Sequence, residues 1–321
     1  MGAQPGKRRQ PGSVHGVLLI DKPQGLTSFD IVARCRKIYG TRRVGHAGTL
    51  DPMATGVLVI LLGEATKLSS VLSADVKQYE ATVQFGSSTD SLDADGKVTR
   101  RAVLEPGWCD EERLAKALQA ERERTLQLPP VVSAIKVDGQ RSYDLARKGK
   151  ARELAPRSVA VKQLEVLARY EYSASFRALV TKGYYVRSFA RDVGEALGVP
   201  SHLSALRRTR SGEFSIDSAV GWPLEGPEPL LSVSEAARRS LPTLELNEAA
   251  AQRLRQGKFI ERSQILGPVP APRPELLAAF YSGILVALVS PHESDEFRVK
   301  RGINLPSELA GACGSREDSG K

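Results

Sequence analysis

The first apolar run of the chain is short and ends at turn residues. In "GVLLIDKPQG", Val17 to Ile20 are all apolar, and Lys22, Pro23 and Gly25 follow directly. An apolar run bounded by Pro and Gly predicts a buried strand that stops at Lys22 and Pro23 and turns at Gly25.

The next segment, "TSFDIVARCRKIYG", changes to helical spacing. Thr27 or Ser28 is the expected N-cap, and Gly40 is the expected end. The apolar positions expected on one face of this helix are Phe29, Ile31, Val32, Cys35 and Ile38.

Strand and helix patterns then mix without a regular strand–helix–strand repeat. Alternating segments at 78–86 and 158–172 predict strands, and the segments 110–122 and 185–198 predict helices, the second closed by Gly198. This order indicates an α+β fold with a mixed or antiparallel sheet.

Prolines cluster between residues 221 and 245, and we place a domain boundary at 240. Beyond it, Asn247 and Gly257 bound a predicted helix, and "GILVALVS" and "EFRVKRGI" predict strands. Residues 241–305 therefore form a small β-rich module. The polar, Gly-rich ends, 1–13 and 306–321, predict disordered tails, the first of them basic.

Composition narrows the class of protein. The chain has 321 residues, of which 41% are hydrophobic and 26% charged, and this fits a globular protein of two domains. Its net charge of +9 favours a polyanionic partner such as nucleic acid, although a mildly basic protein without such a partner fits the same value.

Cysteine and histidine usage argues against several other classes. Three cysteines and four histidines are scattered along the chain, so neither a disulfide framework nor a zinc site is expected. The run from Val17 to Ile20 is too short for a signal sequence or a membrane span. We therefore expect a cytoplasmic protein that does not contact a membrane.

Asp51 is the first candidate for chemistry. In "VGHAGTLDPMATGVLVI", residues 44–60, this carboxylate lies between two segments of small residues. Asp51 and Pro52 fit an ordinary turn. The small residues on both sides also allow close approach of a large, flat ligand, and the spacing of a phosphate-binding P-loop is absent.

Five ordered blocks carry a resemblance to a known family. They are "GVLLIDKPQGLTSFDIV", "RRVGHAGTLDPMATGVLVILLGEATK", "KQYEATVQFGSSTDSLDADG", "LPPVVSAIKVDGQRSYDLARKG" and "TKGYYVRSFARDVGEALG". Together they resemble the TruB family, the bacterial tRNA pseudouridine synthases that act on uridine 55 of the T-loop. The C-terminal module resembles a PUA-like RNA-binding domain.

The resemblance implies the fold and the partner. Residues 14–240 would form a pseudouridine synthase domain, whose mixed, largely antiparallel central sheet is flanked by helices. Residues 241–305 would form the PUA-like domain. The implied substrate is the T-arm of tRNA, with no cofactor, no metal and no obligate protein partner, and the expected state is a monomer.

The resemblance also implies three catalytic residues. Asp51 matches the nucleophile of a reaction that detaches uracil, rotates it and reattaches it through carbon, either through a glycal or by addition to the base. A carboxylate in a desolvated pocket tends to protonate, and Arg187 matches the arginine that pairs with it, its planar fork being able to grip both oxygens. Tyr79 matches the residue that stacks on the base and moves a proton.

Further residues are implied to bind the substrate, because a uridine in a folded loop must be flipped out. His46 would fill the space that the base leaves, Lys22 and Pro23 would support the catalytic loop, and Leu206 would line the base pocket. The remaining implied contacts are Tyr184 and, in a thumb-like segment at about 130–155, Arg141, Arg147 and Lys148.

Charge runs support RNA contact. "LRRTRSG" and "RCRKIYGTRRVG" add basic residues near the active-site blocks and predict a phosphate track, although such runs are usually solvated faces. The acidic "TDSLDADG" lacks the glutamate of a calcium loop and predicts a turn between a strand and a helix.

Two rival functions remain open. The catalytic subunit of guide-RNA-dependent pseudouridylation particles shares several of these blocks. A non-catalytic tRNA-folding factor would use the same basic surface.

Overall fold

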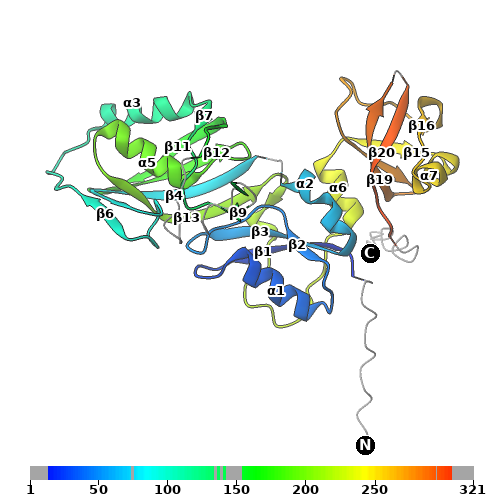
Figure 1. Cartoon of the computed structure of the whole chain (residues 1–321), viewed down its shortest axis with the longest axis horizontal. Helices are drawn as coiled ribbons and strands as arrows, with labels where there is room; N and C mark the ends of the chain where they lie inside the picture. The colour runs from blue at the N-terminus through cyan, green and yellow to red at the C-terminus, as the bar shows by residue number, and fades with distance from the viewer. Residues whose placement is uncertain are drawn as a thin grey trace, which may run out of the picture.

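The computed structural model describes residues 14–73, 76–133, 136–137, 140–141, 154–293 and 295–305, and it shows two β-rich parts (Figure 1). The larger part is built on one eight-stranded sheet with β1, β3, β13, β4, β12 and β11 in that spatial order. All neighbouring pairs on this path are antiparallel except β13 with β3. The predicted mixed, largely antiparallel sheet is therefore confirmed.

The strands of this sheet are β1 (Gly16–Lys22), β2 (Val44–His46), β3 (Thr55–Leu62), β4 (Lys77–Phe85), β11 (Val161–Arg169), β12 (Ser173–Val180), β13 (Ser201–Ser211) and β14 (Phe214–Ser215). Short pairs outside it are β5 (Ser87–Thr89) with β6 (Val98–Arg101), β7 (Leu126–Gln127) with β10 (Arg157–Ser158), and β8 (Lys136–Val137) with β9 (Gln140–Arg141). The helical elements of this part are α1 (Ser28–Ile38), η1 (Gly63–Leu68), α2 (Ser69–Leu72), α3 (Glu111–Arg122), α5 (Val186–Leu197) and η2 (Ile216–Ser218).

The smaller part follows α6 (Val233–Ser240) and has its own sheet, ordered β16, β20, β19, β18, β15 and β17. Its elements are β15 (Thr243–Leu246), α7 (Glu248–Arg255), β16 (Ile260–Glu261), η3 (Arg262–Gln264), β17 (Ile265–Leu266), β18 (Leu277–Tyr281), β19 (Ile284–His292) and β20 (Glu296–Gly302). In Figure 1 it lies beyond α2 and α6, at the end of the larger part that carries β1 to β3. None of the helices in the described ranges is both long and apolar enough to cross a membrane.

The apolar runs of β1 and β3 are explained by burial on both faces. Alternate residues of the two strands join two separate cores: Leu18 and Leu58 pack in the core of the larger part, whereas Val17 and Val59 pack in a core shared with α6, β18 and β19. A strand that is covered on both faces needs apolar side chains at every position. The continuous apolar run from Val57 to Leu62 is therefore explained by the packing of both faces of β3.

Several predicted element ends are confirmed. Thr27 caps α1 with a capping box, Asn247 caps α7, and α5 ends at Gly198 in a left-handed conformation. Phe29 is an exception, because it is 64% exposed, with the guanidinium of Arg36 5.7 Å from its ring centre, and does not join the buried face of α1.

The acidic segment at 89–96 was predicted wrongly as a turn between a strand and a helix. It connects β5 to β6, and backbone bonds from Asp90 to the Lys97 carbonyl and from Gly96 to the Asp93 carbonyl close it. The next helix, α3, begins only at Glu111. All four residues of β6 are exposed, so the sequence shows no alternation there that would reveal a strand.

Two buried cations hold the loop at residues 48–54, which joins β2 to β3. Arg208, 1% exposed on β13, donates to the carbonyls of Val57 (2.8 Å), Gly48 (3.1 Å) and Thr49 (3.4 Å). The Lys22 ammonium donates to carbonyls of residues 23, 26 and 52, at 2.8, 2.7 and 3.3 Å. These contacts fix the loop backbone from within the protein, since buried carbonyl groups need donors.

Gly56 generates the first prediction. It has φ +103°, and a Cβ there would lie 2.2 Å from the Arg208 carbonyl oxygen. Gly56→Ala must therefore separate β3 from β13, and we expect the free energy of unfolding to fall by at least about 2 kcal/mol in chemical denaturation. Gly45→Ala is the control, because nothing lies within 4 Å of its Cβ position. Equal stability of the two variants would contradict the close approach.

Lys22 generates a second prediction, on pH. Burial lowers the pKa of its ammonium from 10.5 to about 8, with Arg208 adding to the shift and Asp51 opposing it. Between these values the folded protein releases the proton while the unfolded chain keeps it, so the wild type gains stability as pH rises. This gain is absent from Lys22→Met. The stability of the wild type relative to this variant should therefore rise by up to roughly 1.4 kcal/mol per pH unit.

Denaturation at about pH 8 and about pH 10 measures this difference, with Lys162→Met at an exposed position as the matched control. A difference between wild type and Lys22→Met that stays constant across this range would show that Lys22 does not titrate there.

Candidate active site

A cavity of about 300 Å³ lies where the loop at 48–51, β4, β13 and the start of α5 meet. Its wall contains Asp51, Tyr79, Tyr184, Arg187 and Leu206. The first and last of these residues are 155 positions apart in the sequence (206 − 51 = 155). The other lining residues are Gly48, Thr49, Leu50, Ser73, Lys77, Arg157, Lys182, Gly183, Tyr185, Val186 and Arg208. The structure thus brings five of the predicted site residues together.

The charges of Asp51 and Arg187 meet in this wall. Arg187 Nε lies 2.9 Å from Asp51 Oδ2, a close ion pair rather than a well-aligned hydrogen bond. Arg187 is 5% exposed, whereas the Asp51 side chain is 36% exposed to the cavity. The arginine is thus buried behind a carboxylate that remains accessible.

Arg187 does not grip both oxygens of Asp51, as its planar fork could, because its other end is engaged elsewhere. Nη1 donates to the Ser91 carbonyl at 3.0 Å and lies 3.6 Å from Asp93 Oδ2. Asp93 is itself buried and accepts from the Ser91 hydroxyl at 2.5 Å. One guanidinium therefore joins two carboxylates from two different loops.

Asp93 was missed by the sequence analysis, which rejected its segment as a calcium loop and predicted a turn there. In the part of the chain that the structure describes, no three His, Cys, Asp or Glu side chains gather as they would around a metal ion. No periodicity places Asp93 beside Arg187, since the contact depends on the β5–β6 connection reaching across to α5.

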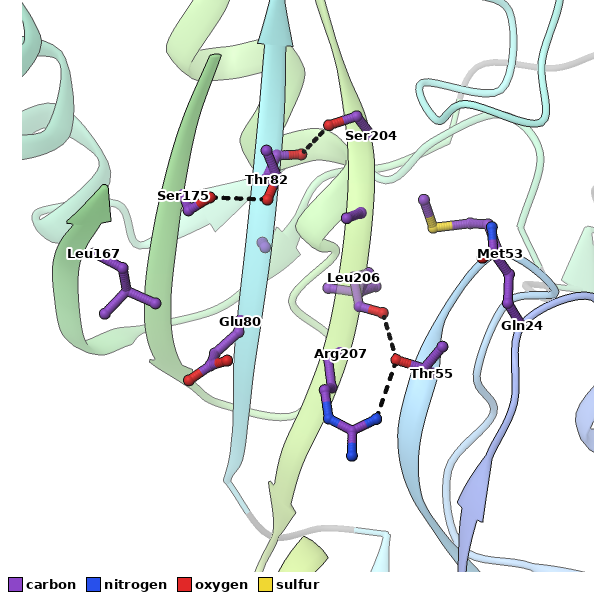
Figure 2. Close-up of a pocket in the computed structure, with 12 residues that line it drawn as sticks. Gln24, Met53, Thr55, Glu80, Thr82, Leu167, Ser175, Ser204, Leu206 and Arg207 are labelled. Carbon is purple, nitrogen blue, oxygen red and sulfur yellow. Dashed lines mark hydrogen bonds between the residues drawn. The ribbon is translucent and has the colours of Figure 1, made fainter. Parts of the chain in front are cut away.

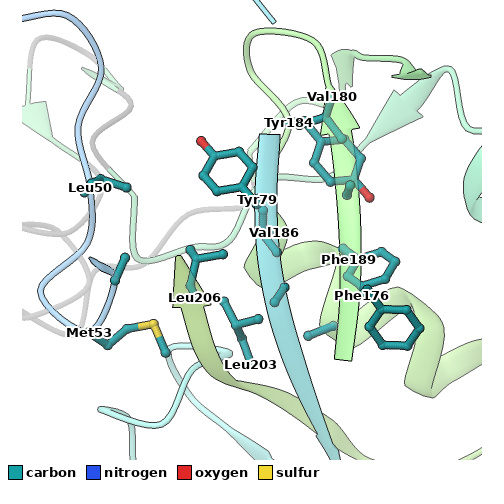
Figure 3. Close-up of a cluster of buried hydrophobic side chains, with 14 of the residues drawn as sticks. Leu50, Met53, Tyr79, Phe176, Val180, Tyr184, Val186, Phe189, Leu203 and Leu206 are labelled. Carbon is teal, nitrogen blue, oxygen red and sulfur yellow. The ribbon is translucent and has the colours of Figure 1, made fainter. Parts of the chain in front are cut away.

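Tyr79 and Leu206 form the apolar side of the cavity. Tyr79 projects from β4 at the edge of the main core, with its hydroxyl pointing away from Phe176 and Phe189 (Figure 3). Leu206 is on the neighbouring strand β13, opposite Ala81. A flat aromatic ring beside an aliphatic side chain suits a nucleobase.

The two tyrosines before α5 face different surroundings. Tyr184 donates its hydroxyl to Glu121 Oε2 at 3.1 Å, and burial together with that carboxylate raises the pKa of Tyr184. Burial also raises the pKa of Tyr185, while the charges of Arg157 and Arg187 lower it. Tyr184 therefore contributes its ring to the cavity wall, and Tyr185, which the sequence analysis did not single out, is the tyrosine within electrostatic reach of Asp51.

The remaining predicted residues lie elsewhere. His46 is half-buried on β2, opposite Ile60, and is not part of the cavity wall. Lys22 and Pro23 lie below the loop, where the Lys22 ammonium contacts the Pro52 carbonyl. Arg141 ends β9, but its side chain, like all of Arg147 and Lys148, lies outside the described residues.

The basic run "LRRTRSG" does not form one phosphate track. Arg207 pairs with Asp21 at 2.7 Å, Arg208 is buried below the loop, and Arg210 pairs with Glu213 at 3.2 Å. Arg207 is opposite Glu80 on β4, whereas Arg208 is opposite Tyr79, so the two arginines lie on different faces of the sheet. Figure 2 shows Arg207 next to Thr55, in a second pocket of about 260 Å³. Strand alternation separates adjacent arginines and turns them toward acceptors of the protein.

Two family models match the chain. The model described as "TruB family pseudouridylate synthase (N terminal domain)" matches residues 36–186, and that described as "tRNA pseudouridylate synthase B C-terminal domain" matches residues 187–222. Asp51 and Tyr79 lie within the first match, and Arg187 begins the second.

Curated relatives agree with these models. A tRNA pseudouridine synthase B from Mycobacterium sp. (strain KMS) is 46% identical over 266 residues, covering 81% of this chain and 89% of that protein. A protein of the same name from Nocardia farcinica (strain IFM 10152) is 42% identical over 273 residues, covering 83% and 89%.

Solved structures share the fold. A Cbf5-Nop10-Gar1 complex contains a chain with a TM-score of 0.68 and 25% identity, covering 92% of this chain and 86% of that one. A chain of an H/ACA RNP bound to a substrate RNA containing 2′-deoxyuridine has a TM-score of 0.67 and 24% identity, covering 90% and 85%. From its family models and its relatives, the chain belongs to the TruB family of pseudouridylate synthases.

Proposed function

We propose that this protein is a tRNA pseudouridine synthase that isomerises uridine 55 of the T-loop. The observation that carries the proposal is the pairing of the accessible Asp51 carboxylate with the buried Arg187 guanidinium, 2.9 Å apart in the wall of a cavity. The relatives named tRNA pseudouridine synthase B support the substrate.

In the proposed reaction, Asp51 is the nucleophile. Its carboxylate either assists departure of the base from the sugar, or adds to the uracil ring and is expelled later. In both routes the carbon–nitrogen glycosidic bond breaks, the sugar carbon bonds to C5 of uracil, and C5 loses its proton. Arg187 lies directly against this carboxylate and has the opposite charge. The buried guanidinium also fixes the orientation of Asp51, because its other end is held by Asp93 and the Ser91 carbonyl.

The base would reach Asp51 only after flipping out of the folded T-loop. Tyr79 would stack on the extruded uracil and move a proton at the sugar, with Leu206 and Tyr184 completing the apolar wall. His46 would fill the gap left in the RNA, which fits its position outside the cavity wall. Lys22 and Pro23 would keep the catalytic loop in place.

The proposal includes the division of the chain. Residues 14–240 are the catalytic domain, with the thumb-like segment at about 130–155 and its Arg141, Arg147 and Lys148 contacting the T-arm. Residues 241–305 are the PUA-like RNA-binding domain, and the two ends are tails. The protein would act as a monomer in the cytoplasm, without cofactor, metal or obligate protein partner.

The guide-dependent particle is the rival that the solved structures bring forward, since one similar chain comes from an H/ACA RNP and the other from a Cbf5-Nop10-Gar1 complex, and both descriptions name multi-component assemblies. Incubation of the purified chain with an unmodified tRNA transcript distinguishes the two. Pseudouridine at position 55 without added guide RNA or protein supports the proposal, whereas modification that requires a guide would contradict it.

Asp51→Asn tests the nucleophile. The amide keeps the shape of the side chain but cannot act as an anionic nucleophile, so we expect tritium release from C5-labelled uridine to fall by a factor of at least about 1,000. The dissociation constant for tRNA should stay within about threefold of the wild-type value, since Asp51 contributes no attractive charge to RNA binding.

Asp217→Asn, at an exposed position, is the matched control. Turnover that persists in Asp51→Asn would refute the nucleophile assignment. Loss of tRNA binding together with activity would point to a folding defect and would be checked by circular dichroism.

Asp93→Asn tests the second carboxylate. Its loss leaves the buried Arg187 with one anionic partner, and we expect kcat to fall roughly 10- to 100-fold with little change in tRNA affinity. Asp95→Asn, exposed in the same loop, is the control. Equal kcat values for the two variants would show that Asp93 does not position Arg187.

A further inference from the structure

The wall of the active-site cavity has a surplus of positive charge. It contains five basic side chains, and Asp51 is its one acidic residue among the described residues that line it. The basic residues are Lys77, Arg157, Lys182, Arg187 and Arg208. Like charges at one site repel one another, so such a surplus needs acceptors from the protein or from a ligand.

Three of the five have protein acceptors. Arg187 pairs with Asp51 and Asp93, and Arg208 donates to the carbonyls of Val57, Gly48 and Thr49. The buried Lys77 donates to the Ser73 carbonyl at 3.1 Å. These three groups are part of the framework that holds the loop and the carboxylates.

Arg157 and Lys182 differ from the other three. Within the described ranges, neither makes a side-chain hydrogen bond or an ion pair. Arg157 is exposed on the short strand β10, and Lys182 is exposed directly before Gly183. Gly183 has φ +90°, and no atom lies within 4 Å of where its Cβ would be, so the turn that carries Lys182 borders open space.

Both residues lie close to the reacting group. Lys182 precedes Tyr184 and Tyr185 in the turn that leads into α5 and Arg187. Arg157 acts on the same tyrosine as Asp51, since both charges shift the pKa of Tyr185, in opposite directions. Their donors thus border the volume that a nucleotide opposite Asp51 would occupy.

The chemistry of a nucleotide identifies what these donors can bind. Uracil and ribose are neutral, and the phosphodiester is the anionic part of the nucleotide. Lysine and arginine at the rim of a cavity contact phosphate oxygens as charged donors. We propose that Lys182 and Arg157 form a phosphate-binding pair that holds a phosphodiester next to the flipped nucleotide at the mouth of the active-site cavity.

This assignment rests on the proposed function and adds residues that neither the sequence blocks nor the charge runs singled out. The pocket next to Thr55 on the opposite face of the sheet offers no such pair, because Arg207 is engaged by Asp21 and Glu80 by Arg177. Of these two pockets, only the one that contains Asp51 has basic side chains without an acceptor in the described part of the protein.

The experiment measures binding of a T-arm stem-loop RNA to the full chain at several salt concentrations. Asp51→Asn is present throughout, to prevent turnover. Adding Lys182→Gln or Arg157→Gln should weaken binding about fivefold and reduce the slope of log K against log salt by about 0.7–0.9, the value for one lost phosphate contact. Lys162→Gln and Arg100→Gln, at exposed positions outside the cavity wall, should leave the slope unchanged.

A second RNA locates the phosphate. It carries one neutral methylphosphonate, on either side of the target uridine in separate syntheses. At the contacted phosphate, this change should weaken binding to the parent protein about fivefold and have a smaller effect on Lys182→Gln or Arg157→Gln, in which one of the two cations remains. It should have no further effect on the variant that carries both substitutions. Additive losses at both phosphates, or slopes equal to those of the controls, would overturn the inference.

Turnover by the unmutated protein on the unmodified stem-loop separates this result from a failure of the proposed function. If the stem-loop is converted to product but the binding losses from the protein and RNA changes are additive, the phosphate-binding pair is refuted and the proposed function stands. Absence of product refutes the synthase activity, and the binding cycle still reports whether the two cations contact a phosphate.

Discussion

The site depends on one buried guanidinium that two carboxylates share. Burying an arginine costs several kcal/mol unless its charge is paired, and Arg187 meets this requirement with Asp51 at one end and Asp93 at the other. Asp51 comes from a loop that precedes β4 in the chain, and Asp93 comes from a loop that follows β4. Arg187 is in the first turn of α5. The ion pairs therefore fix three segments of the chain relative to one another, and the accessible oxygens of Asp51 follow from that arrangement.

The backbone of the loop at residues 48–54 is held in place for a related reason. Arg208 and Lys22 direct their donors at loop carbonyls rather than at carboxylates, so they hold the backbone without neutralising Asp51. Gly56 allows β3 to approach β13 closely enough for the Arg208 side chain to reach the loop. Because β3 is buried on both faces, the loop continues into a strand that cannot shift easily.

The sequence allowed prediction of local elements and of residues within ordered blocks, but not of contacts that depend on register. Caps and a C-terminal glycine predicted the ends of α1 and α5, because those signals act within a few residues. Asp93 could not be placed, since its partner lies 94 positions away (187 − 93 = 94). Arg207 and Arg208 look equivalent in sequence, yet they lie on opposite faces of β13, whose register shifts twice.

The basic side chains of this cavity thus fall into two groups, those paired with acceptors inside the protein and those exposed at its rim. Arg187, Arg208 and Lys77 are withdrawn from solvent, and salt screens buried pairs only weakly. Arg157 and Lys182 lie at the rim, where screening is strong and no acceptor among the described residues competes for them. An increase in ionic strength would therefore weaken binding of a polyanion without disturbing the geometry of Asp51. The affinity for RNA and the arrangement of the reacting carboxylate thus depend on different cations of one cavity.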